Sequence, residues 1–359
     1  MTIIFLIIIS CFLFGIDDFF EPHFTVGGYG ELHYNHKTID DNSSTIGLDF
    51  HRFITFINYN FTEEWSIKSE LELEHNFVSE GEGELELEQA YVNYHNGNWG
   101  FGAGVLLISA GILNETHEPP TFLSVERPDY NKYIIPTTWF GNGIHFYGSF
   151  SDFNIKLVIH EDLEGEKLLD WNIDENNDET IAGFSGGIRD GRGKGYKTSA
   201  YSWTKNLSTS YTAIQGLNVG GSYTVNNAPI NNNKNNTIGV SLIEIHASYS
   251  ANNIYSIFEY GMLALKHNDL DDMNGNGYYM DLGYNVAPLI SFENNTLIPW
   301  VRYGGYTTDD SSDANMINIW KIGMTYKPID KIVFKAEYGI DTKDEVKTKE
   351  FNIGIGYMF

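Results

Sequence analysis

The chain ends in the stretch FNIGIGYMF, residues 351–359, and this stretch decides the fold class. Large apolar side chains occupy every second position, while asparagine or glycine fills most positions between them. This alternation is typical of a β-strand with one apolar face. A last strand that ends on an aromatic residue is typical of the closing strand of a bacterial outer-membrane β-barrel, and a strand of a soluble β-sandwich is the alternative. The residues that we expect to close the barrel are Phe351, Tyr357 and Phe359.

The composition favours a β-barrel over a helical membrane protein. The sequence has 359 residues, which suits two soluble domains or one large barrel. Aromatic residues make up 15% of it and glycines number 36, as expected for strands with aromatic girdles and tight turns. After residue 15 no segment approaches the roughly 20 apolar residues of a spanning helix. The formal net charge of −26 argues against nucleic acid as a partner, because phosphate contacts need lysine and arginine.

The N-terminal residues 1–15 form an apolar run of signal-peptide length, although no lysine or arginine precedes it. The stretch Ile8–Cys11 resembles a lipobox, which would leave Cys11 as a lipidated N-terminus. The alternative is that Cys11 is removed with the signal peptide. Since the sequence contains one cysteine, no internal disulfide is possible. We expect residues 16–359 to form a single barrel domain.

Period-two alternation predicts further strands along the whole chain. We expect them at about residues 24–34, 46–61, 65–77, 84–94, 99–107, 144–150, 153–159, 199–212, 217–225, 238–249, 254–265, 278–286, 297–306, 317–326 and 332–340. After Gln89 the alternation of the fourth segment changes phase, and a β-bulge there would explain the change.

Short and long connections alternate between these segments. Seven short connections and eight longer polar ones predict about sixteen antiparallel strands, with the short turns and both termini on the periplasmic side. Longer polar connections are expected near residues 36–44, 226–236 and 341–348, and the longest are 108–142 and 161–198. The fold class is therefore all-β, a transmembrane antiparallel barrel that encloses an aqueous channel.

The third external loop, residues 108–142, is too apolar for a solvated connection. It contains Ile112, Phe122 and Ile134, so we expect it to fold into the lumen and narrow it, and an external flap is the alternative. The residues of this loop expected at the constriction are Asn114, Glu115, His117, Glu118, Glu126, Arg127 and Lys132. Several of these, with Asp129, resemble ligands for a hard cation, but their spacing fits no cation-binding loop, so we predict no metal site.

Two neighbouring segments carry six glutamates on what would be one lumenal face. These are Glu70, Glu72, Glu74, Glu84, Glu86 and Glu88, and the basic residues expected near them are Arg52, Lys68, Arg127 and Lys132. Because like charges on paired strands repel, the carboxylates need cations, altered pKa values or basic partners. This wall would favour cations in the pore, or it would be a structural wall that supports the loop.

A basic cluster and the absence of catalytic motifs complete the pattern. Arg189, Arg192, Lys194 and Lys197 lie in the loop 161–198, which we expect to be external. They would attract anions or lipid phosphate, or offset nearby carboxylates. The sequence contains no nucleophile elbow, zinc-binding helix or phosphate-binding loop, so we predict no enzymatic activity and no cofactor.

Five segments give the chain a resemblance to the phosphate-selective porin O and P superfamily, in particular to its uncharacterised porin-like members. They are LDFHRF at 48–53, ELELEH at 70–75, GELELEQAY at 83–91, NETHEPPTF at 114–122 with VERP at 125–128, and IIPTTW at 134–139. The resemblance implies a sixteen-stranded porin, a homotrimer, and a third loop folded into the lumen. Phosphate-selective members use lumenal arginines and lysines, whereas this wall is rich in glutamate, so phosphate selectivity is not expected.

We therefore expect a porin of the bacterial outer membrane for passive diffusion of small hydrophilic solutes or ions, with a preference for cations or neutral solutes. Its partners would be outer-membrane lipid and lipopolysaccharide, its own copies in a homotrimer, and the barrel-assembly machinery, which would engage the C-terminal strand. The alternatives are an anion-selective porin, a structural or adhesive barrel acting through loop 161–198, and an outer-membrane hydrolase.

Overall fold

The computed structural model describes residues 20–40, 43–79, 83–173, 179–292 and 294–359. The expected signal peptide and Cys11 lie outside these residues. Within them, no helix is both long enough and apolar enough to cross a membrane.

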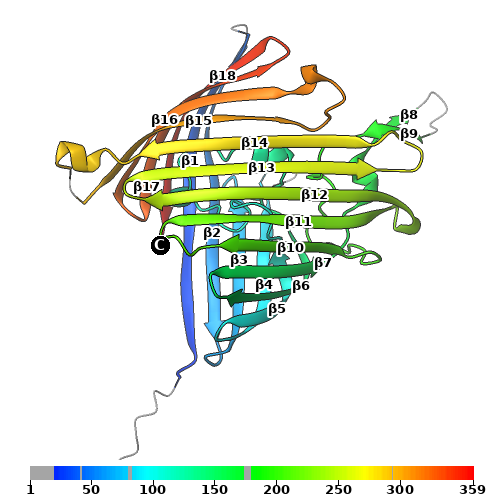
Figure 1. Cartoon of the computed structure of the whole chain (residues 1–359), viewed down its shortest axis with the longest axis horizontal. Coiled ribbons are helices and arrows are strands. Elements are labelled where there is room, and N and C mark those ends of the chain that lie inside the picture. The colour runs from blue at the N-terminus through cyan, green and yellow to red at the C-terminus, as the bar shows by residue number, and fades with distance from the viewer. Residues whose placement is uncertain (1–19, 41–42, 80–82, 174–178, 293) are drawn as a thin grey trace, which may run out of the picture.

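Sixteen antiparallel strands of the described chain close into one barrel (Figure 1). They are β1 (His23–Ile39), β2 (Ser43–Asn60), β3 (Trp65–Glu74), β4 (Leu85–Asn96), β5 (Trp99–Leu107), β6 (Phe140–Phe150), β7 (Phe153–His160), β10 (Thr204–Tyr211), β11 (Leu217–Ile230), β12 (Asn233–Ala251), β13 (Ile254–Lys266), β14 (Met273–Tyr284), β15 (Thr296–Thr307), β16 (Ile317–Ile329), β17 (Ile332–Lys343) and β18 (Val346–Met358). Each barrel strand pairs with its neighbours in the sequence, except that β7 pairs with β10 and β1 pairs with β18. The predicted fold class and strand number are confirmed.

The C-terminal strand closes the barrel, as its sequence predicts. β18 pairs with β1, so that Tyr357 lies opposite Gly30. Beyond the strand, the backbone N–H of Phe359 donates to the carbonyl of Gly28 at 2.9 Å, and the Gly28 N–H donates back at 3.2 Å. The Phe359 ring stacks on Phe53 of β2, with ring centroids 5.9 Å apart. The hydrogen bonds and the ring contact of Phe359 thus hold the end of the last strand against β1 and β2.

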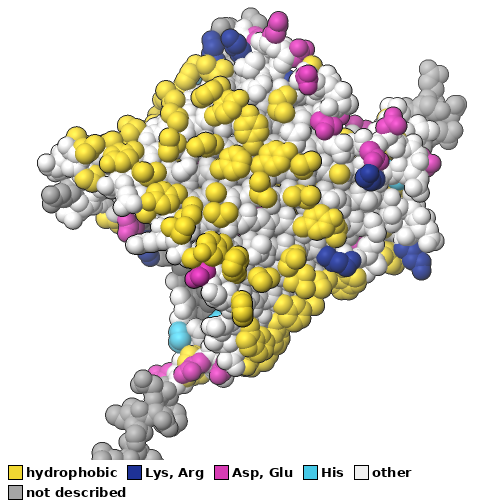
Figure 2. All heavy atoms as spheres, viewed as in Figure 1, with side chains coloured by type: hydrophobic (Ala, Val, Ile, Leu, Met, Phe, Trp, Pro, Cys, Tyr) yellow, Lys and Arg dark blue, Asp and Glu magenta, His cyan; other side chains and the backbone are white. Residues whose placement is uncertain are grey.

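Alternating side chains give the barrel an apolar outside and a polar inside. On β13, Phe258 and Met262 are exposed, whereas Glu259 between them is buried. On β18, Phe351 and Ile353 are exposed, whereas Asn352 is buried. Figure 2 shows apolar side chains spread across the viewed face, with charged side chains gathered mainly toward its edges. Such a belt is the surface that lipid covers in a transmembrane barrel.

Several boundaries differ from the prediction for local backbone reasons. The third strand ends at Glu74 rather than at residue 77, because His75 and Asn76 adopt left-handed φ angles of 53° and 67°. The bulge expected in the fourth strand is present, and the register shifts there between Glu70–Gln89 and Leu71–Leu87. A second bulge, which the sequence did not reveal, shifts the β1–β2 register between Glu31 and Leu32.

Three of the connections predicted to be long are strand extensions with tight turns, so those predictions are wrong. β11 and β12 run on to a two-residue turn at Asn231 and Asn232, whose φ angles are 50° and 57°. β17 and β18 meet at Asp344 and Glu345 in the same way, and β1 and β2 extend toward each other at residues 39 and 43. Positive φ at both turn positions matches the twist of paired strands, so polar sequence there continues the sheet instead of looping.

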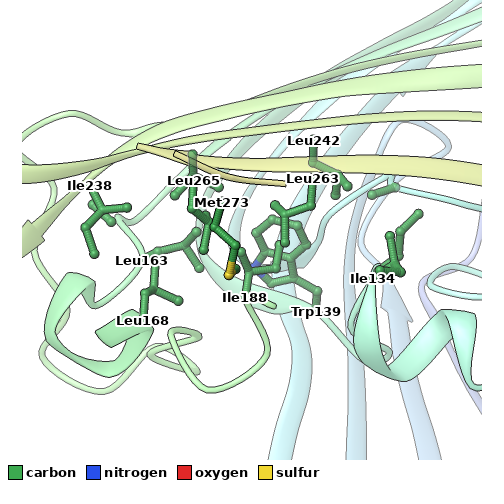
Figure 3. Close-up of a cluster of buried hydrophobic side chains, with 14 of the residues drawn as sticks. Ile134, Trp139, Leu163, Leu168, Ile188, Ile238, Leu242, Leu263, Leu265 and Met273 are labelled. Atoms are coloured by element: carbon green, nitrogen blue, oxygen red, sulfur yellow. The ribbon is translucent and has the colours of Figure 1, made fainter. Parts of the chain in front are cut away.

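The connection 161–198 is not simply an external polar loop. It contains the 3-10 turn η2 (Gly165–Leu168) and the hairpin of β8 (Leu169–Ile173) and β9 (Glu179–Phe184). Leu163, Leu168 and Ile188 are buried against strands β12 to β14, together with residues of the third loop. In Figure 3 Trp139 of the third loop and Leu163, Leu168 and Ile188 of the second connection gather beneath Leu242, Leu263, Leu265 and Met273 on the barrel wall, while Ile134 lies apart from them. The two longest connections therefore pack into one core on one side of the barrel.

Candidate functional site: the constriction of the barrel

The segment between β5 and β6, residues 108–139, crosses the interior of the barrel. The Ile112 N–H donates to the carboxylate of Glu259 on β13. The Val125 N–H donates to Glu337 on β17 at 2.7 Å, and the Ser124 hydroxyl accepts from Arg302 on β15 at 2.9 Å. In the closed strand order, β13, β15 and β17 lie far around the barrel from β5 and β6. These contacts support the predicted inward fold of the loop over an external flap.

Asn114 holds the base of this segment together. Its side-chain amide donates to the carbonyls of Ile108 at 2.6 Å and Trp139 at 3.2 Å. Its carbonyl oxygen accepts from the Trp139 N–H at 2.7 Å. The residue is fully buried, so Asn114 positions the segment and does not face a cavity.

The segment separates two cavities that open toward opposite ends of the barrel. The larger, of about 750 Å³, reaches the end with the long connections and is lined in part by Arg52, Glu72 and Lys194. The other, of about 730 Å³, reaches the end with the short turns and is lined in part by Lys68 and Glu115. In outer-membrane barrels the first end is external and the second periplasmic. We call them the external cavity and the periplasmic cavity.

The six glutamates of β3 and β4 divide between the buried wall and its rim. Glu70 and Glu72 are each 2% exposed, and Glu88 is fully buried. Glu72 lies directly opposite Glu86 in the strand register. Glu74 and Glu84 stand nearer the external end, where with Glu72 and Glu86 they line the external cavity.

Basic side chains neutralise part of this wall. One of them, Lys194, comes from the second long connection and was not expected beside the glutamates. Arg52 pairs with Glu31 at 2.8 Å and with Glu72 at 3.1 Å. Lys194 of the second long connection pairs with Glu84 at 2.8 Å and also contacts the Glu86 carboxylate. Burial alone would lower the pKa of Lys194, but these two carboxylates outweigh it and raise the pKa. Hydrogen bonding with Glu86 and with Lys194 lowers the pKa of Glu84 to about 2.

Two of the other basic residues expected near the glutamates, Arg127 and Lys132, line the external cavity together with Glu72, Glu74, Glu84 and Glu86. Arg127 donates to the backbone carbonyl of His117 at 3.4 Å, and the Lys132 ammonium lies 5.2 Å from the centre of the Tyr133 ring. Lys68 lines the periplasmic cavity. Among the described residues, none of these three forms an ion pair with the glutamate wall.

The remaining loop residues have separate environments. Glu115 pairs with Lys156 of β7. Glu126 accepts from His33 at 2.9 Å and from Asn35 at 2.8 Å, both on β1. Glu118 is partly buried, with one carboxylate oxygen buried and lacking a hydrogen-bond partner. The loop is thus attached to several walls of the barrel by separate polar contacts.

His117 reaches the buried end of the glutamate wall. It is 3% exposed, and its Nε2 atom lies 3.7 Å from Glu70 and 3.8 Å from Glu88. Burial, followed by the nearby Arg127 charge, lowers the pKa of His117 to about 3, so its imidazole is neutral at physiological pH. The structure brings together His117, Glu70 and Glu88, three predicted site residues, in a buried cluster between the third loop and strands β3 and β4.

Sequence reasoning missed a second charged wall, on strands β14 to β18. Arg302 pairs with Asp281 on the adjacent strand, with both contacts at 2.6 Å, and Lys321 lies 3.1 Å from Glu350. Lys335 donates to the Ser124 carbonyl of the third loop at 2.6 Å. Asp281, Arg302 and Lys321 are isolated charges in otherwise apolar or small stretches. Their place on the inward parity of their strands is the signal that would have identified them.

The comparisons with known proteins agree on the fold. No family model matches the sequence. An uncharacterised protein of Aquifex aeolicus (strain VF5) is 29% identical over 374 aligned positions, which cover 93% of this chain and 80% of that protein. The resemblance to the phosphate-selective porin superfamily therefore stays a prediction.

Solved structures of porins and channels share the architecture. The anion-selective porin of Comamonas acidovorans aligns with a TM-score of 0.61 and 11% identity, over 94% of this chain and all of that one. The outer-membrane channel DcaP of Acinetobacter baumannii has a TM-score of 0.61 at 11% identity, over 94% and 97%. OmpF of Salmonella typhi has a TM-score of 0.60 at 12% identity, over 94% and 97%. A closed barrel of this fold with an apolar outer belt belongs in the bacterial outer membrane, as predicted.

Proposed function

We propose that this protein is a porin that lets small hydrophilic solutes or ions diffuse passively through its barrel. The observation that carries the proposal is the pair of polar cavities, of about 750 and 730 Å³, on either side of the inward segment 108–139. A wide barrel needs such a segment to set the size of what passes. A purely structural barrel needs neither cavity, and we propose no enzymatic activity.

The charges at the two depths of the pore support a preference for cations or neutral solutes. Among the described residues, nine carboxylates and eight lysines or arginines line the external cavity, so its field is mixed. Deeper in the wall, Glu70 and Glu88 face His117 and form no ion pair with lysine or arginine in the described chain. Carboxylates at the narrow part of a pore lower the potential for cations and raise it for anions.

An anion-selective porin is the second candidate, because of one specific observation. The second long connection brings Arg189, Arg192 and Lys194 to the lining of the external cavity. These side chains would concentrate anions at the mouth of the pore. The contribution of Lys194 is reduced, because Lys194 is paired with Glu84 and Glu86. The sign of the reversal potential in a salt gradient separates the two candidates.

We also propose that the barrel is a homotrimer in a bilayer of outer-membrane lipid and lipopolysaccharide, and that β18 is the strand the assembly machinery engages. The apolar outer belt supports contact with lipid. Chemical cross-linking of the protein in native outer membranes would test the trimer, for which a ladder ending at three copies is expected.

Liposome swelling tests diffusion directly. Liposomes that contain the folded protein should swell in isotonic solutions of small sugars, at rates that fall steeply as the sugar grows. A matched variant that carries Asn114→Ala should show a weaker dependence on sugar size, because it loosens the inward segment. Folded protein that causes no swelling would contradict the proposal and favour a structural or adhesive barrel.

A further inference from the structure

We infer that Glu70, Glu88 and His117 form a binding site for one divalent transition-metal cation, with Zn²⁺ as the best fit. Their three candidate ligand atoms lie within 4.8 Å of one another. The inference concerns binding and does not depend on what passes through the barrel.

The distances fit a metal better than hydrogen bonds. His117 Nε2 lies 3.7 Å from Glu70 Oε1 and 3.8 Å from Glu88 Oε2, whereas a hydrogen bond between nitrogen and oxygen spans roughly 2.7–3.2 Å. Bonds of about 2.0–2.2 Å to a tetrahedral Zn²⁺ place its ligands roughly 3.4 Å apart. His117 therefore needs to approach each carboxylate by only a few tenths of an ångström to share one ion with it.

The unpartnered ring nitrogens of His117 are the observation that points to a bound ligand. Neither of its ring nitrogens has a hydrogen-bond partner, although the side chain is 3% exposed. A buried polar atom without a partner costs roughly 1–3 kcal/mol. A bound cation would satisfy Nε2 and the buried Glu88 Oε2 atom, which also lacks a partner.

Neighbouring side chains orient both carboxylates toward the histidine. Gln89 donates to Glu70 Oε2 at 2.5 Å, and the Thr138 hydroxyl donates to Glu88 Oε1. In each carboxylate, the oxygen that faces His117 is therefore the one not used by that neighbour. Outer hydrogen bonds of this kind fix the orientation of ligands in metal sites.

The ligand set selects among metals. One imidazole and two carboxylates suit Zn²⁺ and related transition metals. Ca²⁺ takes six to eight oxygen ligands, and Mg²⁺ retains several waters, so neither fits a dry group of three side chains that includes imidazole. The two carboxylates also balance the charge of one divalent cation.

A second group of carboxylates gives a route from the external cavity. Glu72, Glu86 and Glu88 also bring candidate ligand atoms within 4.8 Å of one another. Glu72 and Glu86 line the external cavity, and Glu88 belongs to both groups. A cation that enters from outside thus meets successive carboxylates on its way to His117.

Metal binding to the purified protein tests the inference. The folded barrel in detergent would be stripped with a chelator, checked by its heat-dependent gel migration, and titrated with ZnCl₂ by isothermal calorimetry. We expect one Zn²⁺ ion to bind tightly to each chain. His117→Asn and Glu88→Gln should each weaken this binding at least about tenfold, the smallest loss that changes to outer hydrogen bonds typically cause. Glu70→Gln provides a third variant if either of the others fails to fold.

Two controls separate this site from other histidines. His145→Gln removes another buried histidine whose ring nitrogens lack partners but which belongs to no candidate group in the described chain, so it should leave the tight equivalent unchanged. Asp49, His51 and His75 form a candidate group at the external rim, and any equivalent bound there should disappear in His75→Gln alone. The inference would be overturned if the wild-type protein bound no Zn²⁺ tightly, or if folded His117→Asn bound Zn²⁺ with unchanged affinity. A proton shared between the two carboxylates would then take the place of the metal ion.

Discussion

The Nη1 atom of Arg52 donates to the carboxylate of Glu72 at 3.1 Å, across the pair of strands β2 and β3. On its other side, Arg52 Nε lies 2.8 Å from Glu31 on β1. All three side chains are almost fully buried. One guanidinium thus joins three adjacent strands and offsets part of the negative charge of Glu31 and Glu72.

Replacement of Arg52 by methionine should destabilise the barrel. Breaking a buried ion pair from one side leaves uncompensated charge and costs roughly 3–5 kcal/mol. The thermal midpoint in detergent, followed by circular dichroism, should therefore fall clearly. Lys37→Ala is the matched control, because its pair with Glu350 spans 3.4 Å and its side chain is 48% exposed, so a loss of about 0–1 kcal/mol is expected. Equal midpoints for Arg52→Met and wild type would show that the buried pair adds nothing.

Replacement of Lys194 by glutamine should increase cation preference. The change frees Glu84 and Glu86 in the external cavity from their ammonium partner. The ratio of K⁺ to Cl⁻ permeability should rise by roughly twofold or more, since lumenal charges set this ratio. Lys266→Gln removes a mostly exposed lysine that pairs with Asp272 outside the constriction and should leave the ratio unchanged. The prediction fails if both variants match wild type.

Replacement of Asn114 by alanine should loosen the inward segment. It removes three hydrogen bonds at the base of the loop and leaves buried backbone groups unpaired, which costs about 1–3 kcal/mol each. Single-channel recordings should show larger and less steady conductance. The control is Thr116→Ala, which removes one hydrogen bond from an exposed side chain to the Ile112 carbonyl. Unchanged conductance in Asn114→Ala would mean that the barrel wall holds the segment without this residue.

Acid should release Glu126 from β1. Burial alone would raise the pKa of Glu126, but hydrogen bonding with His33 and its charge lower the pKa to about 2. Because this folded-state pKa lies below the ordinary value of 4.5, the carboxylate stabilises the fold fully above about pH 4.5, and the contribution is lost as pH falls through 2.

Denaturant unfolding of wild type and Glu126→Gln between pH 6 and pH 2 would measure this contribution. The difference in free energy of unfolding should be largest near pH 6 and should shrink toward pH 2. A difference that stays constant across the range would assign the effect of the substitution to packing and not to the charge.

Much of the barrel could be predicted because alternation is a local property of the sequence. The outward residues of β18 and the bounds of β5 follow from period two alone. The expectation that residues 108–142 fold inward rests on apolar residues that no solvated loop needs. The turn residues His75 and Asn231 were harder to read, because a left-handed φ angle interrupts or reverses a strand within polar sequence.

The missing parts of the site depend on contacts between distant segments. Lys194 reaches Glu84 across 110 positions of the sequence, and no local pattern links the two. The second long connection reads as polar because its buried residues, such as Leu163 and Ile188, are isolated in the sequence. Likewise, Arg302 and Asp281 lie on adjacent strands, yet neither belongs to a charged motif. Only the strand register and the closure of the barrel bring such pairs together.

The reversal potential in a planar bilayer under a KCl gradient at neutral pH tests the central claim most directly. We predict a stable conductance and a reversal potential whose sign indicates a preference for cations over anions. The double variant Glu70→Gln and Glu88→Gln should conduct with the potential moved toward zero, because it removes two carboxylates that form no ion pair with lysine or arginine in the described chain. A potential of the sign for anions, or the absence of conductance from folded protein, would contradict the account.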